Sequence, residues 1–323
     1  MTKWVYNLLF AAALLALAPL GAAADSYPSA TIKIVVGFGP GSGTDILARL
    51  LAEQLQQSLE HPVIVENKPG AGAQIAATTV ARAAPDGYTL FLTSNSSHSV
   101  NPHIYRTLSY DPKKDFTPIA GLAYFPFVLA IDPTLPPKTP QEFVAWARAN
   151  SGKVTYAYGT PTVRIPAAAL DHLLHLNATG VGYKSSPPAM MDVIGGQVSF
   201  LVTDLASSQA QIKQGQLRAL AVTTSQRSEL APELPTIEET LGLKDFDLAA
   251  WTGLFGPANL PKEIVDRLSK AVVDIMNRPD IRARILALGA EPTPSDAATF
   301  AKLVDRQYEV WGQKVKDAGI EPE

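Results

Sequence analysis

The chain has 323 residues, of which 46% are hydrophobic and 18% are charged, and its formal net charge is -3. This length suits about two domains of ordinary size, and the slightly acidic balance excludes the basic surface that nucleic-acid binding requires. Because the sequence contains no cysteine, disulfides, thiolate metal sites and cysteine nucleophiles are also excluded.

The first 24 residues have the pattern of a secretory signal peptide. Lys3 precedes a short apolar run from Leu8 to Leu20, and Ala22 and Ala24 supply the small residues that a signal peptidase reads;. The alternative is a membrane anchor, but the run is shorter than the roughly 20 residues that span a bilayer, and no later segment is long and apolar enough to cross a membrane. We therefore expect cleavage after Ala24 and a soluble mature protein outside the cytoplasm.

The first third of the mature sequence alternates between strands and helices. Thr31–Phe38 is rich in β-branched residues and predicts a buried strand, whereas Thr44–Leu59 places its leucines on one helical face;. A strand at 62–66, a helix at 72–83 and a strand at 89–93 follow. This βαβαβ order predicts a doubly wound, mainly parallel sheet flanked by helices.

A second α/β run follows, and the chain ends in helices. We expect strands at 125–132, 154–158, 198–203, 217–222 and 250–255, and helices at 141–150, 166–176, 188–194, 207–214, 261–276, 279–288 and 297–318. The late helices show no strand between them, so we expect them to pack back on the first domain. The second domain is then an insertion: residues 25–124 and 249–323 form domain 1, residues 125–248 form domain 2, and the strands 125–132 and 250–255 cross between them.

A glycine-rich loop between the first strand and the first helix is the first candidate site. It offers Phe38, Gly41, Ser42, Gly43, Thr44 and Asp45. The spacing fits neither a dinucleotide fingerprint, nor a phosphate-binding P-loop, nor a nucleophile elbow. Backbone N–H groups at a helix N-terminus favour an anion. The alternative interpretation is a plain tight turn.

A polar loop after the third strand is the second candidate. Its residues Ser94, Asn95, Ser96, Ser97 and His98 offer hydroxyls and amides that bind a carboxylate without competing negative charge. It leaves the carboxyl end of a strand in the same sheet, which is the edge where open α/β sheets bind ligands. The alternative is a solvated polar loop.

Two further candidates lie in the second domain. Gly159, Thr160 and Thr162 follow a strand, and Arg164 has the planar fork that binds a carboxylate through two hydrogen bonds;. Asp204 follows a later strand, where it either orients a lysine, a water or a ligand ammonium group, or caps a helix. The alternative interpretation of Arg164 is a surface arginine near the start of a helix.

Motifs for catalysis and cofactors are missing from the sequence. The five histidines have no metal-ligand spacing, and no Ser-His-Asp order stands out. We therefore predict no catalytic residue, no metal and no cofactor. These absences argue against an enzyme; separately, we expect a monomer.

Sequence pieces along the whole mature chain resemble the Bug family, the periplasmic solute receptors of tripartite tricarboxylate transporters. Each piece is weak alone, but their order and spacing together are specific. They are Tyr27-Pro28, Pro40-Gly41 with Thr44-Asp45, Val65 to Gly72, Ala84 to Leu90, Tyr110 to Phe116, Tyr183-Lys184, Gly195 to Val198, Leu217 to Val222, Leu234 to Thr236, Leu288 to Pro292 and Asp317 to Ile320.

The resemblance implies a two-lobed Venus-flytrap fold that closes on a small carboxylate and hands it to the membrane subunits of a transporter. It implies that Phe38, the 41–45 loop, the 94–98 loop and the 159–162 loop hold the ligand, and that this ligand is a di-, tri- or aromatic carboxylate. Two alternatives stay open: a carboxylate sensor that signals to a membrane kinase, and an exported hydrolase.

This sequence departs from the family pattern in two loops. Gly37 and Ser42 stand where the family has a proline and a second glycine, and Ser42 adds a hydroxyl. In the second domain, Arg164 ends a loop that is usually rich in glycine and serine and ends near a histidine. A cation facing the far end of the ligand favours a dicarboxylate over a monocarboxylate.

Overall fold

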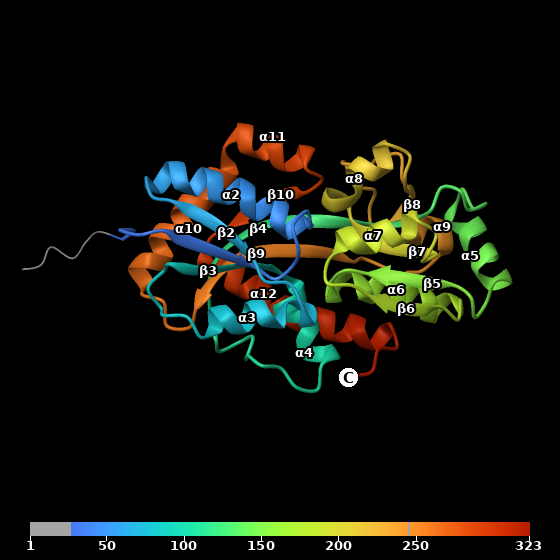
Figure 1. The fold of residues 1–323 in the computed structure, drawn as a ribbon, viewed down its shortest axis with the longest axis horizontal. Helices are drawn as coiled ribbons and strands as arrows, with labels where there is room; N and C mark the ends of the chain where they lie inside the picture. The colour runs from blue at the N-terminus through green and yellow to red at the C-terminus, as the bar shows by residue number, and fades with distance from the viewer. Residues whose placement is uncertain (1–26, 245) are drawn as a thin grey trace, which may run out of the picture.

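The computed structural model describes residues 27–244 and 246–323. The expected signal peptide lies outside the described residues. The described chain is an α/β structure of two lobes joined by a continuous ten-stranded sheet, with helices packed on both faces (Figure 1).

The first lobe contains β1 (Ile32–Val36), β2 (Val63–Asn67), β3 (Thr89–Ser94), β9 (Ala249–Pro257), β10 (Glu291–Ser295) and the first half of β4 (Phe116–Ile131). Its strand order is β2-β1-β3-β9-β4-β10; β1 pairs in parallel with β2 and β3, and the remaining pairs are antiparallel. Its helices are α2 (Gly43–Leu59), η1 (Ala71–Ala73), α3 (Gln74–Ala81), η2 (Ser96–Val100), α4 (Asn101–Ile104), α10 (Lys262–Asn277), α11 (Pro279–Ala287) and α12 (Ala297–Asp317).

The second lobe contains the second half of β4 with β5 (Thr155–Tyr158), β6 (Thr179–Gly182), β7 (Phe200–Asp204) and β8 (Arg218–Val222). Its order is β6-β5-β7-β4-β8; β5 pairs in parallel with β6 and β7, and β4 pairs antiparallel with β7 and β8. Its helices are α5 (Pro140–Ala149), α6 (Pro161–Leu174), α7 (Ser186–Ile194), α8 (Leu205–Lys213) and α9 (Ile237–Leu241).

One long strand and one return segment connect the lobes. β4 pairs with β9 as far as Pro126 and with β7 from Phe127 onward, so it belongs to both lobes. The chain returns at Leu248, whose N–H bonds to Thr223 of the second lobe just before β9 begins. These changes of partner lie close to the expected boundaries at 124/125 and 248/249, and that division stays a prediction.

Most expected elements are present, and the differences have local causes. β4 begins at Phe116, not at 125, because the register shift beside Pro118 lets the strand continue past a residue without an N–H;. Helix α6 begins at Pro161, not at 166, because Thr160 caps it and proline suits the first helical position;. The expectation of no strand among the late helices is wrong, because β10 pairs with β4.

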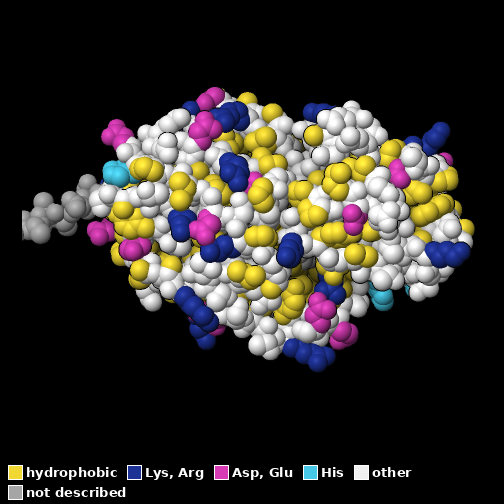
Figure 2. Space-filling view, in the orientation of Figure 1, with side chains coloured by type: hydrophobic (Ala, Val, Ile, Leu, Met, Phe, Trp, Pro, Cys, Tyr) yellow, Lys and Arg dark blue, Asp and Glu magenta, His cyan; other side chains and the backbone are white. Residues whose placement is uncertain are grey.

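The surface carries no broad area of one charge on the face shown in Figure 2, where lysine, arginine, aspartate and glutamate side chains are interspersed. The late helices α10 and α12 pack against β4, α2 and η2, as expected for helices that return to the first lobe. Within the described part of the chain, no helix has the length and apolar character that a membrane span requires.

Candidate functional site

Four helices begin around one small space between the lobes. Residues at or next to the first turns of α2, α6, α7 and α8 line it, and α2 comes from the first lobe whereas the other three come from the second. The lining residues are Phe38, Ser42, Gly43, Thr44, Ser94, Phe125, Phe127, Thr160, Thr162, Val163, Ser186, Asp204, Ala250 and Thr252. Each helix N-terminus carries about half a positive charge, so this cleft pocket favours an anion.

The loop before α2 is shaped by its own side chains. Ser42 caps the helix by accepting a hydrogen bond from the Asp45 N–H at 3.4 Å;. Gly41 has φ +80°, a left-handed conformation that glycine adopts without strain;. The loop therefore turns sharply and presents Gly43 and Thr44 to the cleft pocket.

Asp45 holds this loop in place and does not reach the cleft pocket. Its carboxylate accepts hydrogen bonds from the Gly41 N–H at 2.9 Å and from Arg49 Nε at 3.0 Å. The Asn67 side-chain amide donates both to Asp45 Oδ1 and to the Phe38 carbonyl. Asp45 is thus already saturated by the protein, which makes it a support of the anion site.

The polar loop after β3 touches the second lobe directly. Ser96 Oγ lies 2.6 Å from Thr162 Oγ1, and that threonine hydroxyl also donates to Asn95 Oδ1 at 3.1 Å. Ser94 Oγ donates to Ser96 Oγ at 3.2 Å and lines the cleft pocket. A chain of hydroxyls therefore joins the two lobes beside the pocket.

Asp204 both caps α8 and lines the cleft pocket. Its Oδ1 accepts a hydrogen bond from the Ser207 N–H at 2.8 Å, so the helix-cap interpretation of this residue is confirmed. Burial raises the pKa of the Asp204 carboxyl, partly offset by its hydrogen bonds with Ser207;. The raised pKa favours the neutral acid and so lessens the repulsion of a bound anion.

Arg164 lies in a second cavity that adjoins the cleft pocket. This rim cavity has a volume of about 290 Å³ and shares Phe38 and Thr160 with the cleft pocket. The Arg164 guanidinium lies over the Tyr158 ring, and its Nη1 donates to Glu323 Oε1 at 2.8 Å. This ion pair joins the second lobe to the end of the first lobe across the rim.

His98 lies behind the polar loop, in the core of the first lobe. Its ring stacks on Phe255 at 4.0 Å between centroids, and Nδ1 lies 2.9 Å from Ser97 Oγ. Burial lowers the pKa of His98 to about 3, so the ring is neutral near pH 7;. Its position indicates a packing role.

Half of the predicted site residues therefore line the cleft pocket. Those that line it are Phe38, Ser42, Gly43, Thr44, Ser94, Thr160, Thr162 and Asp204. Those outside it are Gly41, Asp45, Asn95, Ser96, Ser97, His98, Gly159 and Arg164; of these, Gly159 and Arg164 line the rim cavity.

Sequence reasoning missed six lining residues. They are Phe125, Phe127, Val163, Ser186, Ala250 and Thr252. Two sequence signals could have found some of them. Phe125 and Phe127 alternate along one strand, so they face the same side of it. Ser186 stands before Pro187-Pro188, a pattern typical of a helix start.

The lobes leave little room in the cleft pocket. Its free space is about 30 Å³, well below the roughly 300 Å³ of ordinary small-molecule sites. A methyl group added at Gly43 would lie 2.6 Å from Asp204 Oδ1 of the opposite lobe. A larger ligand therefore requires the lobes to move apart before they close on it.

Comparison with protein families finds a match over most of the chain. Residues 47–320 match the model described as the tripartite tricarboxylate transporter family receptor. A UPF0065 protein of Bordetella bronchiseptica is 34% identical over 317 residues, which is 98% of this chain and 94% of that protein. Protein BugT of Bordetella pertussis is 31% identical over 92% of this chain and 91% of its own length.

Solved structures share the fold. An R. palustris protein determined with adipate superposes with a TM-score of 0.89 and 30% identity, covering 92% of this chain and 100% of that one. MatC of Rhodopseudomonas palustris, determined with bound malate, superposes with a TM-score of 0.84 and 32% identity, covering 90% and 100%.

Proposed function

The chain belongs to the family of tripartite tricarboxylate transporter receptors, and on that premise we propose that it captures a small organic carboxylate between its lobes and delivers it to the membrane subunits of such a transporter. The family consists of periplasmic solute-binding receptors, so the chain is a receptor and not an enzyme. The proposal places it in the periplasm, exported by its signal peptide.

The convergence of helix N-termini from both lobes carries this proposal. The first turns of α2 and α6 approach each other across the cleft and bring Thr44 and Thr162 to the same pocket. Backbone N–H groups and hydroxyls in such a place bind a carboxylate with charge-assisted hydrogen bonds of roughly 1.5–3 kcal/mol each. A ligand that touches both lobes stabilises the closed arrangement, because the open arrangement lacks half of these contacts.

A dicarboxylate is the ligand class that the geometry favours. Arg164 follows Thr160 by four residues, a rise of about 6 Å along the helix. Arg164 lines the rim cavity, Thr162 lines the cleft pocket, and Thr160 lines both. One ligand carboxylate then binds at the helix N-termini and the other at Arg164. The relatives determined with adipate and malate bind dicarboxylates, which supports the same class for this chain.

A thermal-shift screen of the purified mature protein tests the proposal. The panel contains mono-, di-, tri- and aromatic carboxylates, with the uncharged diamide of each diacid as its matched control. Ligand at 100 times its Kd stabilises the folded state by about 2.7 kcal/mol, so we expect a rise in melting temperature with a dicarboxylate and none with its diamide. A panel without any carboxylate-specific rise would contradict the proposal.

A further inference from the structure

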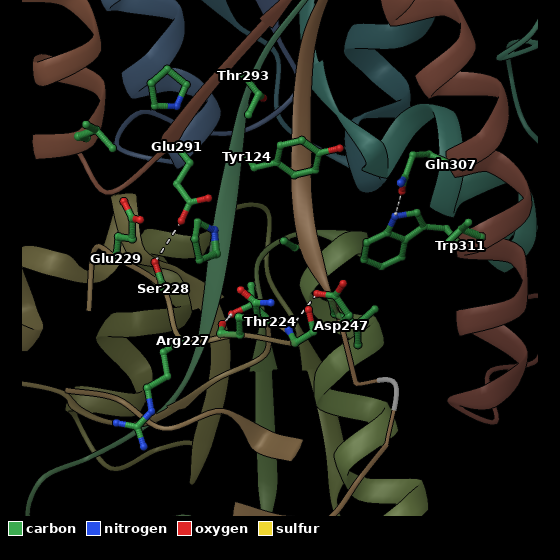
Figure 3. A pocket seen from close by; sticks show the side chains of 18 of the residues that line it. Tyr124, Thr224, Arg227, Ser228, Glu229, Asp247, Glu291, Thr293, Gln307 and Trp311 are labelled. Atoms are coloured by element: carbon green, nitrogen blue, oxygen red, sulfur yellow. Dashed lines mark hydrogen bonds between the residues drawn. The ribbon is translucent and has the colours of Figure 1, made fainter. Parts of the chain in front are cut away.

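A groove of about 810 Å³ lies at the junction of the lobes, apart from the cleft pocket, and is shown in Figure 3. Its walls come from the loop after β8, which includes Ser225 and Ser228, and from β10, α11 and the Trp311 side of α12. We call it the hinge groove, because its floor is formed by β4 and by the segment that returns from the second lobe.

The sheet order places the hinge groove and the cleft on opposite flanks of the crossing strands. In the first lobe the cleft loops follow β1 and β3, whereas the groove wall is β10, on the other side of β9 and β4. In the second lobe the cleft loops follow β5 and β7, whereas the groove wall follows β8, on the other side of β4.

The side chains of β4 also divide between the cleft pocket and the hinge groove. Phe125 and Phe127 line the cleft pocket, whereas Tyr124 and Pro126 line the hinge groove. Neighbouring residues of a strand point to opposite faces. The paired residues agree, because Phe125 pairs with Ala250 of the cleft pocket and Pro126 pairs with Ala249 of the groove.

The free volume between the lobes differs at the two places. It is about 30 Å³ in the cleft pocket and about 810 Å³ in the hinge groove. The groove walls meet through the hydrogen bond from Ser228 Oγ to Glu291 Oε1, at 3.2 Å (Figure 3). A hinge rotation whose axis passes through the crossing strands, between the two spaces, opens the cleft as it moves the groove walls toward each other.

From this geometry we propose that the hinge groove sets the position of the lobes, and thereby ligand affinity, from the side opposite the ligand. A bulky side chain in the groove resists the approach of its walls, disfavours the open arrangement and shifts the population toward the closed one. The inference rests on the two-lobed receptor of the proposed function, but not on which carboxylate it binds.

Tryptophan at Thr293 tests this inference. Thr293 is an exposed residue of β10 that lines the groove, and Thr179 is an exposed residue of the edge strand β6, away from it. Thr293→Trp is therefore compared with Thr179→Trp as the matched control. Ser225→Trp, on the opposite wall, repeats the test with a second variant, so that a folding defect in one of them does not decide the result.

The readout is the distance between two spin labels. It is measured by double electron–electron resonance, with no carboxylate ligand added. Because the chain has no cysteine, Ile75→Cys and Met191→Cys label it uniquely; these exposed residues lie on helices that follow β2 and β6, the outermost strands of the cleft flank.

We expect each groove variant to raise the population of short distances by roughly two-fold or more, with Thr179→Trp matching the parent. Unchanged or longer distances in a folded groove variant would overturn the inference. Since no ligand is added, a failed carboxylate screen leaves this test intact.

Discussion

Arg164 is the residue on which the choice of ligand class depends. Its guanidinium is mostly buried, with 18% of the side chain exposed, and its partner in this structure is the Glu323 carboxylate. A second ligand carboxylate in the rim cavity would meet the same guanidinium. The ion pair with Glu323 therefore marks the position at which we expect a distal carboxylate to bind.

Replacing Arg164 is expected to change the affinity for dicarboxylates but not for monocarboxylates. Arg164→Ala is expected to weaken a dicarboxylate by roughly ten-fold or more, as the loss of a charge-assisted hydrogen bond implies, and to leave its monocarboxylate analogue nearly unchanged. Calorimetry with both ligands measures the difference.

Glu323→Gln supplies the control, because it breaks the same ion pair but keeps the arginine. We expect it to preserve dicarboxylate affinity. Equal losses for the mono- and the dicarboxylate, or a loss in Glu323→Gln as large as in Arg164→Ala, would contradict this role of Arg164.

At single positions, the sequence predicts the site only in part. Glycines and hydroxyls directly after a strand predict Gly43, Thr44 and Thr162, because the chemistry of a helix start is local. Asp45 and His98 look equally suitable in the sequence, yet one is saturated by Gly41 and Arg49 and the other stacks in the core. Gly41 and Arg49 are each four residues from Asp45, but whether its carboxylate turns toward them or toward the cleft depends on the folded loop. The stacking of His98 on Phe255 depends on the tertiary fold in the same way.

Among the elements, helix α2 is the one of the four cleft helices that comes from the first lobe, so its first turn faces the second lobe across the cleft. Gly43, in its first turn, faces Asp204 of the opposite lobe, and a Cβ there would also lie 3.1 Å from Phe125. Alanine is a better helix former than glycine. The substitution therefore suits the helix, while its Cβ crowds Asp204 across the cleft and the Phe125 ring on the crossing strand β4.

Gly43→Ala is expected to keep the melting temperature of the unliganded protein and to weaken carboxylate binding by about ten-fold or more, which is about 1.4 kcal/mol. Thermal unfolding and calorimetry measure the two effects. Gly195→Ala is the matched control, since Gly195 ends α7 and its nearest neighbour to an added Cβ is 3.3 Å away. Undiminished affinity in Gly43→Ala would show that the lobes do not meet there in the liganded protein.

Elements with strong local signals were predicted, and those without were not. Period and caps located α2, α5 and α12 to within a few residues. β6 contains two glycines and β10 two prolines, so neither looks like a strand in the sequence. Pairing with β5 and with β4 makes them strands, and that pairing depends on the tertiary fold;.

For the whole molecule, two crossing segments divide a cleft from a hinge groove. The order of elements predicted the insertion of one domain into the other, which stays a prediction. The family resemblance implied the two-lobed fold, which the solved relatives share. The groove behind the hinge was not predicted, because its walls come from parts of the chain more than 60 residues apart, such as Ser228 and Glu291.

The central claim is that helix N-termini of both lobes bind a carboxylate between them. A crystal structure of the mature protein with the carboxylate that gives the largest thermal shift tests it most directly. We predict a ligand carboxylate between the first turns of α2 and α6, within hydrogen-bonding distance of Thr44 and Thr162. A ligand bound elsewhere, whether in the hinge groove or on the outer surface, with the cleft free of it, would contradict the claim.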